Sequence, residues 1–484
     1  MQFRELLDGV AVLDWVGNPD VDVVAVTQDS RRVEPGTCFV CVPGARVDGH
    51  EFAADAVALG AVAVVVDRPL PIDVPQAVVG APSHAIGSAA ARIHGQPSTS
   101  MRVFGVTGTN GKTTTTYLME SIIRSAGARS AVIGTTGNRI GDTPCGGSYT
   151  TPLAEDLQAL FAQMRDAQVD AVAMEVSSHA LDQGRVDGTE FTVAAFTNLS
   201  HEHLDYHGDM DSYFEAKARL FERGRTAAAA INADDEYGVR LGTRTRLDGV
   251  PTLLWSVDED ADVSVRSVEM RADGTDLLLA TRAGDIAIQS PLVGRFNVEN
   301  LAGAAALAVA GGYEADVIAR GLSGPIVVPG RVERIERGQP FTVLVDYAHT
   351  PDSLANVLAV ARELSDARVL VVFGCGGDRD RTKRPMMGAV AGERADSVWV
   401  TNDNPRSEDP ADIASEVERG LRSTETRCEI VLDRRAAIEA ALRAAQPGDV
   451  VVIAGKGHET GQTANGVTAP FDDRVVAHEL LGAL

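Results

Sequence analysis

The chain has 484 residues, of which 44% are hydrophobic and 23% are charged, a composition typical of soluble globular domains. Its formal net charge of −24 argues against a general nucleic-acid surface, and no apolar run approaches the ~20 residues of a membrane span. Five cysteines, an odd number, and an N-terminus unlike a signal peptide predict a protein of the reducing cytoplasm.

The first region, residues 1–98, is predicted to form a mixed α/β domain. Valine-rich runs at 21–26, 37–44, 61–67 and 76–80 indicate strands, and alanine-rich segments at 51–60 and 84–95 indicate helices. Cys38 and Cys41 would face opposite sides of one strand, which favours two buried thiols over a metal or redox site. The polar breaker at 96–100 marks the end of this domain.

Two further α/β domains follow. Buried strand segments at 102–107, 170–176, 193–197 and 227–231 alternate with amphipathic helices, a pattern that predicts a mainly parallel sheet over residues 99–330. After a breaker at 328–330, strand segments at 342–347, 368–374, 397–403, 428–433 and 449–455 alternate with helices. This pattern predicts a doubly wound, Rossmann-like domain over residues 331–484.

A glycine-rich loop, TGTNGKTT at 107–114, joins the strand at 102–107 to a helix. Backbone N–H groups and the helix dipole then point at an anion. Lys112 can reach the β- and γ-phosphates of a nucleotide, and the Thr113 hydroxyl can bind Mg²⁺. Val106 stands where a common P-loop has its first glycine, and a ligand-free turn is the alternative. The GKTT run in this context favours a phosphate site.

Two later segments of the central region favour metal-assisted phosphoryl chemistry. Glu175 ends the strand at 170–176, at the sheet edge where α/β proteins bind ligands. The segment HEHLDYHG at 201–208 carries three histidines and two acids. It lacks the i, i+4 histidine spacing of a zinc helix. One histidine as a Mg²⁺ ligand is favoured, with a zinc site or a structural turn as the alternatives.

The chain uses lysine at four positions only, Lys112, Lys217, Lys383 and Lys456, against forty arginines. Each lies in a glycine-rich or chemically loaded segment, where a compact amine with a tunable pKa is useful. Lys217 could be a solvated surface charge on the helix around 209–224. Alternatively, its neutral amine could take up CO₂ to form a carbamate, an oxygen ligand suited to a hard cation.

Seven motifs, in this order, resemble the Mur ligases of peptidoglycan synthesis, and most closely their MurE type: TGTNGKTT, EVSSHAL, NLSHEHLDYHG, EAKARLF, GRFNVENLAGA, DYAHTPDSL and GCGGDRDRTKRPMMG. The resemblance covers nearly the whole chain. It implies an ATP- and Mg²⁺-dependent enzyme that adds the third amino acid to UDP-MurNAc-L-Ala-D-Glu through an acyl phosphate. It also implies a UDP-sugar domain (1–98), a central P-loop ATPase domain (99–330) and a Rossmann-like amino-acid domain (331–484).

The resemblance also implies roles for individual residues. ATP would be held by Gly108, Thr109, Asn110, Gly111, Lys112, Thr113, Thr114, Asn297, Asn300, Asp346 and His349. Two Mg²⁺ ions would be held by Thr113, Glu175, His203 and carbamylated Lys217, so that Lys112, Lys217, Glu175 and His203 are the expected catalytic residues. The UDP-muramyl dipeptide would meet Ser30, Thr150, Thr151, Ser177, Gln183 and Arg185.

Some of these assignments have alternatives. Asn297 could instead be only the N-cap of a helix at 298–310. The loop residues Ala45, Arg46 and Val47 depart from the family pattern, so we expect backbone contacts at most from them. The C-terminal domain would close on its substrates.

The segment Asp403-Asn404-Pro405-Arg406 resembles the version of its loop that selects meso-diaminopimelate, with Arg406 paired to the distal carboxylate. Arg379, Gly455 and Glu459 match further contacts to this amino acid. The alternatives are a plain Asx-Pro turn, a lysine-adding MurE-type ligase, a folylpolyglutamate synthetase-like ligase, and a nucleotide-binding regulator without ligase activity. The expected partners are small-molecule substrates only, and we expect a monomer in the cytoplasm.

Overall fold

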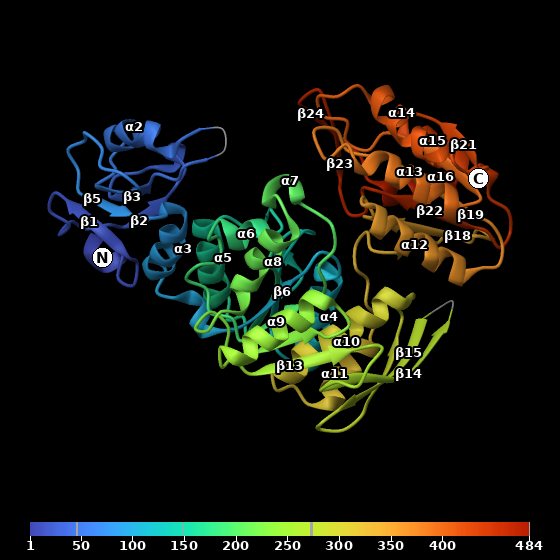
Figure 1. Cartoon of the computed structure of the whole chain (residues 1–484), viewed down its shortest axis with the longest axis horizontal. Helices are drawn as coiled ribbons and strands as arrows, with labels where there is room; N and C mark the ends of the chain where they lie inside the picture. Colours follow the sequence, from blue (N-terminus) through green and yellow to red (C-terminus); the bar gives the residue numbers. More distant parts are fainter. Residues whose placement is uncertain (45–46, 148, 272–273, 484) are drawn as a thin grey trace. The chain divides into compact units, whose positions relative to one another are not determined.

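The computed structural model describes residues 1–44, 47–147, 149–271 and 274–483. It divides into two compact units (Figure 1). The first contains Met1–Ser264, Thr281–Gly284 and Ala302–Gly321, and the second contains Val265–Ala280, Asp285–Leu301 and Leu322–Leu484. Across the described residues, no helix combines the length and the apolarity needed to cross a bilayer.

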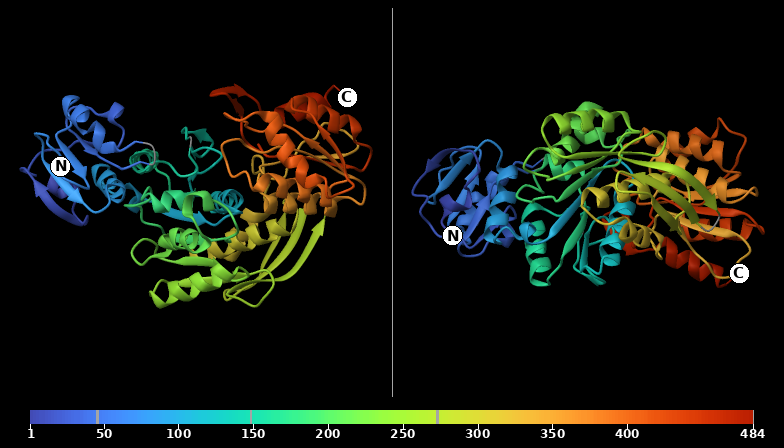
Figure 2. Two further views of the ribbon diagram at one scale, coloured as in Figure 1. Left: turned by 45° about the horizontal axis from the view of Figure 1, so that its top comes forward. Right: turned by 90° about the horizontal axis from the view of Figure 1, so that it is seen from below.

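A five-stranded sheet in the order β1-β5-β4-β3-β2 begins the first unit (blue in Figures 1 and 2). Its strands are β1 (Val12–Val16), β2 (Ala25–Thr27), β3 (Thr37–Val40), β4 (Ala63–Val66) and β5 (Gln76–Val79), all parallel to their neighbours except β1. Helix α2 (Ala53–Ala58) packs in the core on one face, and α1 (Phe3–Leu6) and α3 (Pro82–Ile93) pack in the core on the other.

The two strand cysteines confirm the prediction for them. Cys38 lies in the core shared with α3, and Cys41 lies in the core shared with α2, so their side chains face opposite sides of the sheet. Both are free and fully buried. Burial raises the pKa of the Cys41 thiol to about 12, which makes it unreactive at neutral pH.

A second sheet has the order β16-β15-β14-β13-β12-β11-β6-β10-β7-β8-β9, with β15 (Gly274–Thr281) and β16 (Ile286–Ser290) at one edge. The six strands from β13 to β7 are parallel, as predicted. The other strands are β6 (Arg102–Thr107), β7 (Ser130–Ile133), β8 (Arg139–Ile140), β9 (Thr143–Pro144), β10 (Ala171–Glu175), β11 (Val193–Phe196), β12 (Ala229–Asn232), β13 (Thr252–Ser256) and β14 (Val263–Arg271). The helices are α4 (Lys112–Ser125), α5 (Ala154–Asp166), α6 (Ser178–Asp182), α7 (Leu204–His207), α8 (Met210–Ala218) and α9 (Glu236–Leu247).

The position of β6 decides where the site lies. It is paired with β11 on one side and β10 on the other, so the loops that follow these three strands meet at one sheet edge. Valine, alanine and phenylalanine fill β6, β10 and β11, and every residue of β10 and β11 is buried. Such strands belong in a parallel sheet covered on both faces.

The second unit contains a six-stranded sheet in the order β17-β18-β22-β19-β20-β21. Its strands are β17 (Glu333–Arg334), β18 (Thr342–Asp346), β19 (Val369–Phe373), β20 (Ser397–Val400), β21 (Arg427–Ile430) and β22 (Val450–Ala454). Helices α12 (Pro351–Leu364), α13 (Lys383–Arg394) and α14 (Pro410–Leu421) share one core with it, and α15 (Arg434–Ala444) and α16 (Asp473–Leu481) share the other. This doubly wound arrangement confirms the Rossmann-like prediction.

Smaller elements complete the second unit. Strands β15 (Gly274–Thr281) and β16 (Ile286–Ser290) form an antiparallel pair, and β23 (Gly461–Ala464) and β24 (Val467–Pro470) form a hairpin. Helices α10 (Arg295–Ala310) and α11 (Ala315–Ser323) continue from one unit into the other. Because α10 begins at Arg295, Asn297 lies inside the helix, and its alternative role as the N-cap is wrong.

Candidate active site

The glycine-rich loop between β6 and α4 is fixed by residues that follow β11. The backbone N–H of Thr109 donates to Asn198 O, and that of Asn110 donates to Asn198 Oδ1, both at 2.9 Å. Gly108 has a φ of 151°, and a Cβ there would lie 1.9 Å from Thr197 Oγ1. The close approach of these two loops therefore requires glycine.

Two lysines converge on this loop. Lys112 Nζ donates to Gly108 O at 2.9 Å, and Lys217 Nζ, from α8, donates to the same oxygen at 2.7 Å. Lys217 is buried, with its Nζ 4.6 Å from the centre of the Tyr213 ring. Burial lowers the pKa of Lys217 well below its usual value, and the charge of Lys112 lowers it further. Lys217 therefore carries a neutral amine much more readily than a surface lysine does.

Glu175, at the end of β10, accepts hydrogen bonds from Thr113 at the start of α4 and from Thr135 in the loop after β7. Its Oε2 accepts from the hydroxyls of Thr113 and Thr135 at 3.1 and 3.0 Å, and its Oε1 accepts from the Thr135 N–H at 2.8 Å. The Thr135 hydroxyl also lies 3.0 Å from that of Thr150. Thr113 and Glu175, two of the residues predicted to hold Mg²⁺, are thus in direct contact.

The residues predicted to meet the UDP-muramyl dipeptide adjoin this carboxylate. Thr151 Oγ1 donates to Glu175 O at 2.8 Å and accepts from the Ser177 N–H at 3.1 Å. Arg185 Nη1 donates to Thr151 O at 3.0 Å, and Arg185 Nη2 donates to Gln183 Oε1 at 2.7 Å. Thr151, Ser177, Gln183 and Arg185 therefore form one hydrogen-bonded group.

Other predicted contacts lie apart from that group or outside the described residues. Ser30 lies on the 3₁₀ helix Ser30–Arg32 of the N-terminal sheet region. Val47 is exposed, and its carbonyl accepts from the Gly44 N–H at 3.0 Å. Ala45 and Arg46 lie outside the described residues.

His203 precedes α7 and has a φ of 57°, in the left-handed region. Its ring packs edge-on against that of His179, with 4.8 Å between centroids, and against Tyr213 at 6.2 Å. Partial burial lowers the pKa of His203, and Glu202, whose Oε2 lies 3.7 Å from His203 Nε2, opposes the shift. The ring is therefore neutral more readily than that of a surface histidine, and a neutral ring nitrogen can ligate a cation. Within the described ranges, no three His, Cys, Asp or Glu side chains converge as a metal cluster.

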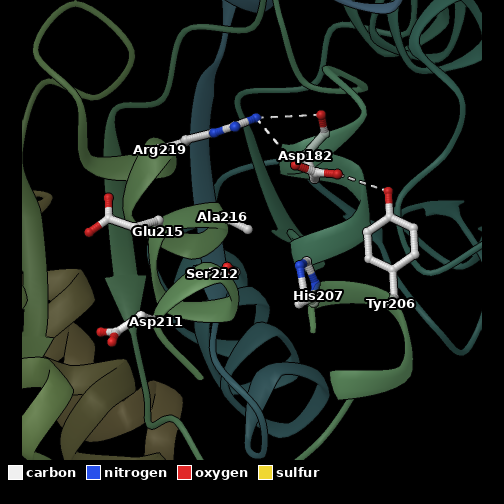
Figure 3. Close-up of a pocket in the computed structure, with 8 residues that line it drawn as sticks. All are labelled: Asp182, Tyr206, His207, Asp211, Ser212, Glu215, Ala216 and Arg219. Carbon is white, nitrogen blue, oxygen red and sulfur yellow. Dashed lines mark hydrogen bonds and ion pairs between the residues drawn. The ribbon is translucent and has the colours of Figure 1, made fainter. Parts of the chain in front are cut away.

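A pocket of about 630 Å³ opens beside α6, α7 and α8 (Figure 3). It is lined by Asp182, Tyr206, His207, Asp211, Ser212, Glu215, Ala216 and Arg219. Its three carboxylates are ion-paired to arginines: Asp182 to Arg219, Asp211 to Arg240, and Glu215 to both Arg240 and Arg244. The Tyr206 hydroxyl donates to Asp182 and accepts from Gln183, so the pocket adjoins the predicted substrate group.

The remaining predicted nucleotide residues lie in the second unit. Asn297 and Asn300 are buried on α10, where Asn300 Nδ2 donates to Asn297 Oδ1 at 3.0 Å. Asp346 ends β18 and accepts from the N–H groups of Val332 and Ala348, both at 2.8 Å. Burial raises the pKa of Asp346, although these hydrogen bonds oppose the shift.

His349 and Lys383 meet near the same sheet edge. His349 Nδ1 lies 2.8 Å from Tyr347 O, and Lys383 Nζ donates to the carbonyl oxygen of His349 at 2.8 Å. Lys383 begins α13, so this contact joins the start of that helix to the loop that follows β18.

The loop from Asp403 to Arg406 follows β20 at the carboxyl end of the second unit's sheet, as predicted, and Asp409 caps α14. Arg406 has a φ of 52°, and its Nη1 donates to Gly377 O at 2.7 Å. The β23–β24 hairpin holds this residue, because Arg406 N–H donates to Thr463 O at 3.0 Å.

The other predicted amino-acid contacts adjoin this loop. Gly377 is closely approached by Pro405, since a Cβ on it would lie 1.9 Å from Pro405 O. Asn404 Nδ2 donates to Glu459 Oε2 at 2.9 Å. A Cβ on Gly455 would lie 3.3 Å from Asp403 Oδ2. Arg379 is exposed on the neighbouring loop, with its Cγ 3.8 Å from where a Cβ on Gly376 would stand.

Sequence reasoning missed several residues of this site. Thr135 and Asn198 organise Glu175 and the glycine-rich loop, and Tyr213 lies over the Lys217 amine. Each is a common residue type in a loop or on a helix, with no spacing that distinguishes it. Thr135 follows β7 and Asn198 follows β11, and this position at the carboxyl end of a parallel strand could have indicated a role in the site.

Comparison with known families matches three successive parts of the chain. Residues 22–102 match the family described as "Mur ligase family, catalytic domain", residues 106–308 match "Mur ligase middle domain", and residues 330–457 match "Mur ligase, glutamate ligase domain". A UDP-N-acetylmuramoyl-L-alanyl-D-glutamate–2,6-diaminopimelate ligase of Geobacillus thermodenitrificans is 46% identical over 473 residues, 96% of each chain. Its counterpart in Streptomyces avermitilis is 44% identical over 96% of this chain and 93% of its own.

Solved structures agree with these matches. A structure of a UDP-N-acetylmuramoyl-L-alanyl-D-glutamate–2,6-diaminopimelate ligase has a TM-score of 0.73 and 35% identity, covering 100% of this chain and 99% of its own. A folylpolyglutamate synthase of Mycobacterium tuberculosis, complexed with ADP and AMPPCP, has a TM-score of 0.67 at 20% identity, covering 82% of this chain and 94% of its own, and shares the fold alone. The chain belongs to the Mur ligase family and has its three-domain α/β fold.

Proposed function

We propose that this Mur ligase joins meso-2,6-diaminopimelate to the D-Glu side-chain carboxylate of UDP-MurNAc-L-Ala-D-Glu, with hydrolysis of ATP to ADP and phosphate. The observation that carries the proposal is the position of Glu175. Its side chain contacts Thr113 of the nucleotide loop, and its backbone carbonyl contacts Thr151 of the predicted substrate group. A phosphate donor and an acyl acceptor bound on either side of Glu175 would meet there.

The reaction runs in two steps on the substrates. A D-Glu carboxylate oxygen attacks the γ-phosphorus of ATP and ADP leaves, which gives an acyl phosphate. The amine of diaminopimelate then attacks the acyl carbon, and phosphate leaves with the C–O electron pair. The loop Gly108–Thr114 binds the phosphates through backbone N–H groups, and Lys112 neutralises charge that grows on the transferred phosphoryl group.

The donor set at this edge fits a hard cation. Thr113 and Glu175 offer hydroxyl and carboxylate oxygens in contact, and the buried Lys217 has the lowered pKa that carbamate formation by CO₂ requires. Thr113, Glu175, His203 and carbamylated Lys217 would hold two Mg²⁺ ions. Bound Mg²⁺ supplies positive charge that shields the phosphate oxygens.

The remaining predicted residues are assigned to the muramyl dipeptide, to ATP and to diaminopimelate. The UDP-muramyl dipeptide binds Thr150, Thr151, Ser177, Gln183 and Arg185, and its nucleotide reaches Ser30. Asn297, Asn300, Asp346 and His349 complete the ATP site. Arg406 binds the distal carboxylate of diaminopimelate, and Asp403 and Glu459 bind its ammonium groups. Further contacts come from Arg379, Asn404, Pro405 and Gly455.

We place the domain boundaries at 1–98, 99–330 and 331–484, which the three family matches support. The enzyme acts as a monomer in the cytoplasm, where its nucleotide-linked substrates are made.

Phosphate release tests this function. With ATP, Mg²⁺ and UDP-MurNAc-L-Ala-D-Glu, release should depend on added meso-diaminopimelate and should be weak with L-lysine. Release that is independent of both the muramyl dipeptide and diaminopimelate would contradict the proposal.

A further inference from the structure

Lys456 lies in the loop that follows β22, and it contacts the loop that carries Asp403 and Asn404. Its side chain is fully buried, and its Nζ donates to Glu459 Oε2 at 2.9 Å and to Asn404 Oδ1 at 3.3 Å. Asp403 Oδ1 lies 3.6 Å from the same nitrogen. The amine therefore joins the loop after β20 to the loop after β22.

Asn404 connects the same two carboxylates. Its Nδ2 donates to Glu459 Oε2 at 2.9 Å and to Asp403 Oδ1 at 3.3 Å, and its Oδ1 also accepts from the Thr463 N–H at 2.9 Å. Both carboxylates are thus bound to one amide and one ammonium. Asp403 is buried and Glu459 is half-buried, and the charge of Glu459 raises the pKa of Asp403, so the two carboxylates repel each other without a cation.

We propose that Lys456 is a positioning residue that favours the ionised forms of Asp403 and Glu459 and orients both carboxylates, so that the cluster of Asp403, Lys456 and Glu459 retains one negative charge for a substrate ammonium group. This inference rests on the proposed function, in which that ammonium belongs to diaminopimelate. Because its side chain is fully enclosed, Lys456 acts through the two carboxylates and does not touch the substrate.

The charged groups near Asp403 and Glu459 support this role. Arg434 and Asp473 form a fully buried pair, with Arg434 Nη2 2.7 Å from Asp473 Oδ2, and they neutralise each other. Lys456 offsets one of the two remaining carboxylates, and the other is left for the incoming ammonium. His458 also faces Glu459 and lowers its pKa slightly.

The pKa values of the two carboxyls shift in opposite directions, and Lys456 lowers both. Burial raises the pKa of Asp403, while Arg434 and Lys456 oppose the shift. Burial would likewise raise the pKa of Glu459, but Lys456 and Asn404 outweigh it, and the pKa is lowered. Without Lys456 the pair would take up a proton at a higher pH. The protonated carboxyl would then present a hydrogen-bond donor to the ammonium group where the wild-type enzyme presents an acceptor, and the contacts from Lys456 that orient both carboxylates would be lost.

The experiment measures KM for meso-diaminopimelate as a function of pH in wild-type enzyme and in Lys456→Met, which keeps the length of the side chain and removes its charge. We expect KM to rise about 10–100-fold at neutral pH, with kcat changed much less. In the variant, KM should rise further as the pH falls, because the raised carboxyl pKa then lies in the assayed range. In wild-type enzyme KM should stay flat over the same range, between about pH 8.5 and about pH 6.

A double-mutant cycle with Glu459→Gln distinguishes positioning from a structural role. If Lys456 acts through Glu459, Lys456→Met should add little to the KM of the Glu459→Gln enzyme. Additive losses, or a variant KM equal to that of wild type, would overturn the inference.

Two further measurements keep the test decisive. Lys456→Gln provides a second neutral variant if the methionine enzyme does not fold. A wild-type KM that itself rises steeply as the pH falls would overturn the inference without any variant. Failure of the proposed function would appear differently, as wild-type enzyme that releases no phosphate with diaminopimelate.

Discussion

Lys112 and Lys217 donate to one carbonyl oxygen, that of Gly108 in the nucleotide loop. Two ammonium groups on a single acceptor repel each other, and Lys217 is the buried member of the pair. Its amine therefore loses its proton more readily, and Lys112 is the lysine that we assign to the phosphates. This division of roles between two lysines underlies the first two predictions.

Lys112→Ala should lower ATP turnover by about 10²–10³-fold, because a preorganised charge on the transferred phosphoryl group is lost. The melting temperature should stay close to that of wild type, since the loop is also fixed by Asn198. Steady-state phosphate release and thermal unfolding check both. Near-normal turnover in the folded variant would remove Lys112 from the nucleotide site.

Lys217→Ala should be nearly inactive, and a short carboxylic acid in the buffer should restore part of the activity by replacing the carbamate. Lys217→Arg should stay inactive, because a guanidinium does not form a carbamate at neutral pH. Lys112→Ala, assayed with the same acid, is the control and should show no rescue. Full wild-type activity in CO₂-free buffer with an unmodified Lys217 amine would contradict this prediction.

Thr135→Val should weaken the apparent affinity for Mg²⁺ by about 10–100-fold, because the hydroxyl that orients Glu175 is removed while the backbone N–H remains. Thr136→Val is the matched control, since that hydroxyl pairs with Tyr117 instead. A titration of activity with Mg²⁺ compares the two. Equal Mg²⁺ dependence in both variants would show that Glu175 has no part in metal binding.

The parallel strands of both large sheets and the helix after the glycine-rich loop could be predicted, because buried parallel strands leave continuous apolar runs. The order of the strands within each sheet could not be predicted. The antiparallel strands β15 and β16 were not predicted. The residues of β15 are buried or half-buried without a strict alternation, and β16 has only five residues. The start of α10 was also missed. Asn297 has the chemistry of an N-cap, yet its side chain donates to Val293 O inside a helix that begins at Arg295.

The candidate site also contains residues that could be predicted from the sequence and residues that could not. Lys112, Thr113 and Glu175 could be predicted because the chemistry of phosphate binding restricts both residue type and spacing. Thr135 could not, because a hydroxyl that orients a carboxylate leaves no pattern in one sequence. The contact of Lys456 with Asn404 could not be predicted either, because the two residues are 52 positions apart and only the fold brings them together.

Arg406→Ala should raise KM for meso-diaminopimelate by about 10–100-fold, because a charge-assisted pair to the distal carboxylate is lost. KM for ATP should not change, since Arg406 contacts Gly377 and the β23–β24 hairpin rather than the nucleotide loop. Initial rates with each substrate varied in turn measure both constants. A parallel rise in KM for ATP would indicate a general disturbance of the domain.

Specificity for the amino acid tests the central claim most directly. Wild-type enzyme is supplied with UDP-MurNAc-L-Ala-D-Glu, ATP, Mg²⁺ and equal concentrations of meso-diaminopimelate and L-lysine, and the two ligation products are separated by mass. The diaminopimelate product should exceed the lysine product by about 100-fold or more, because lysine leaves the Arg406 charge unmet. Comparable amounts of the two products would contradict the assignment of the Asp403–Arg406 loop and of the substrate.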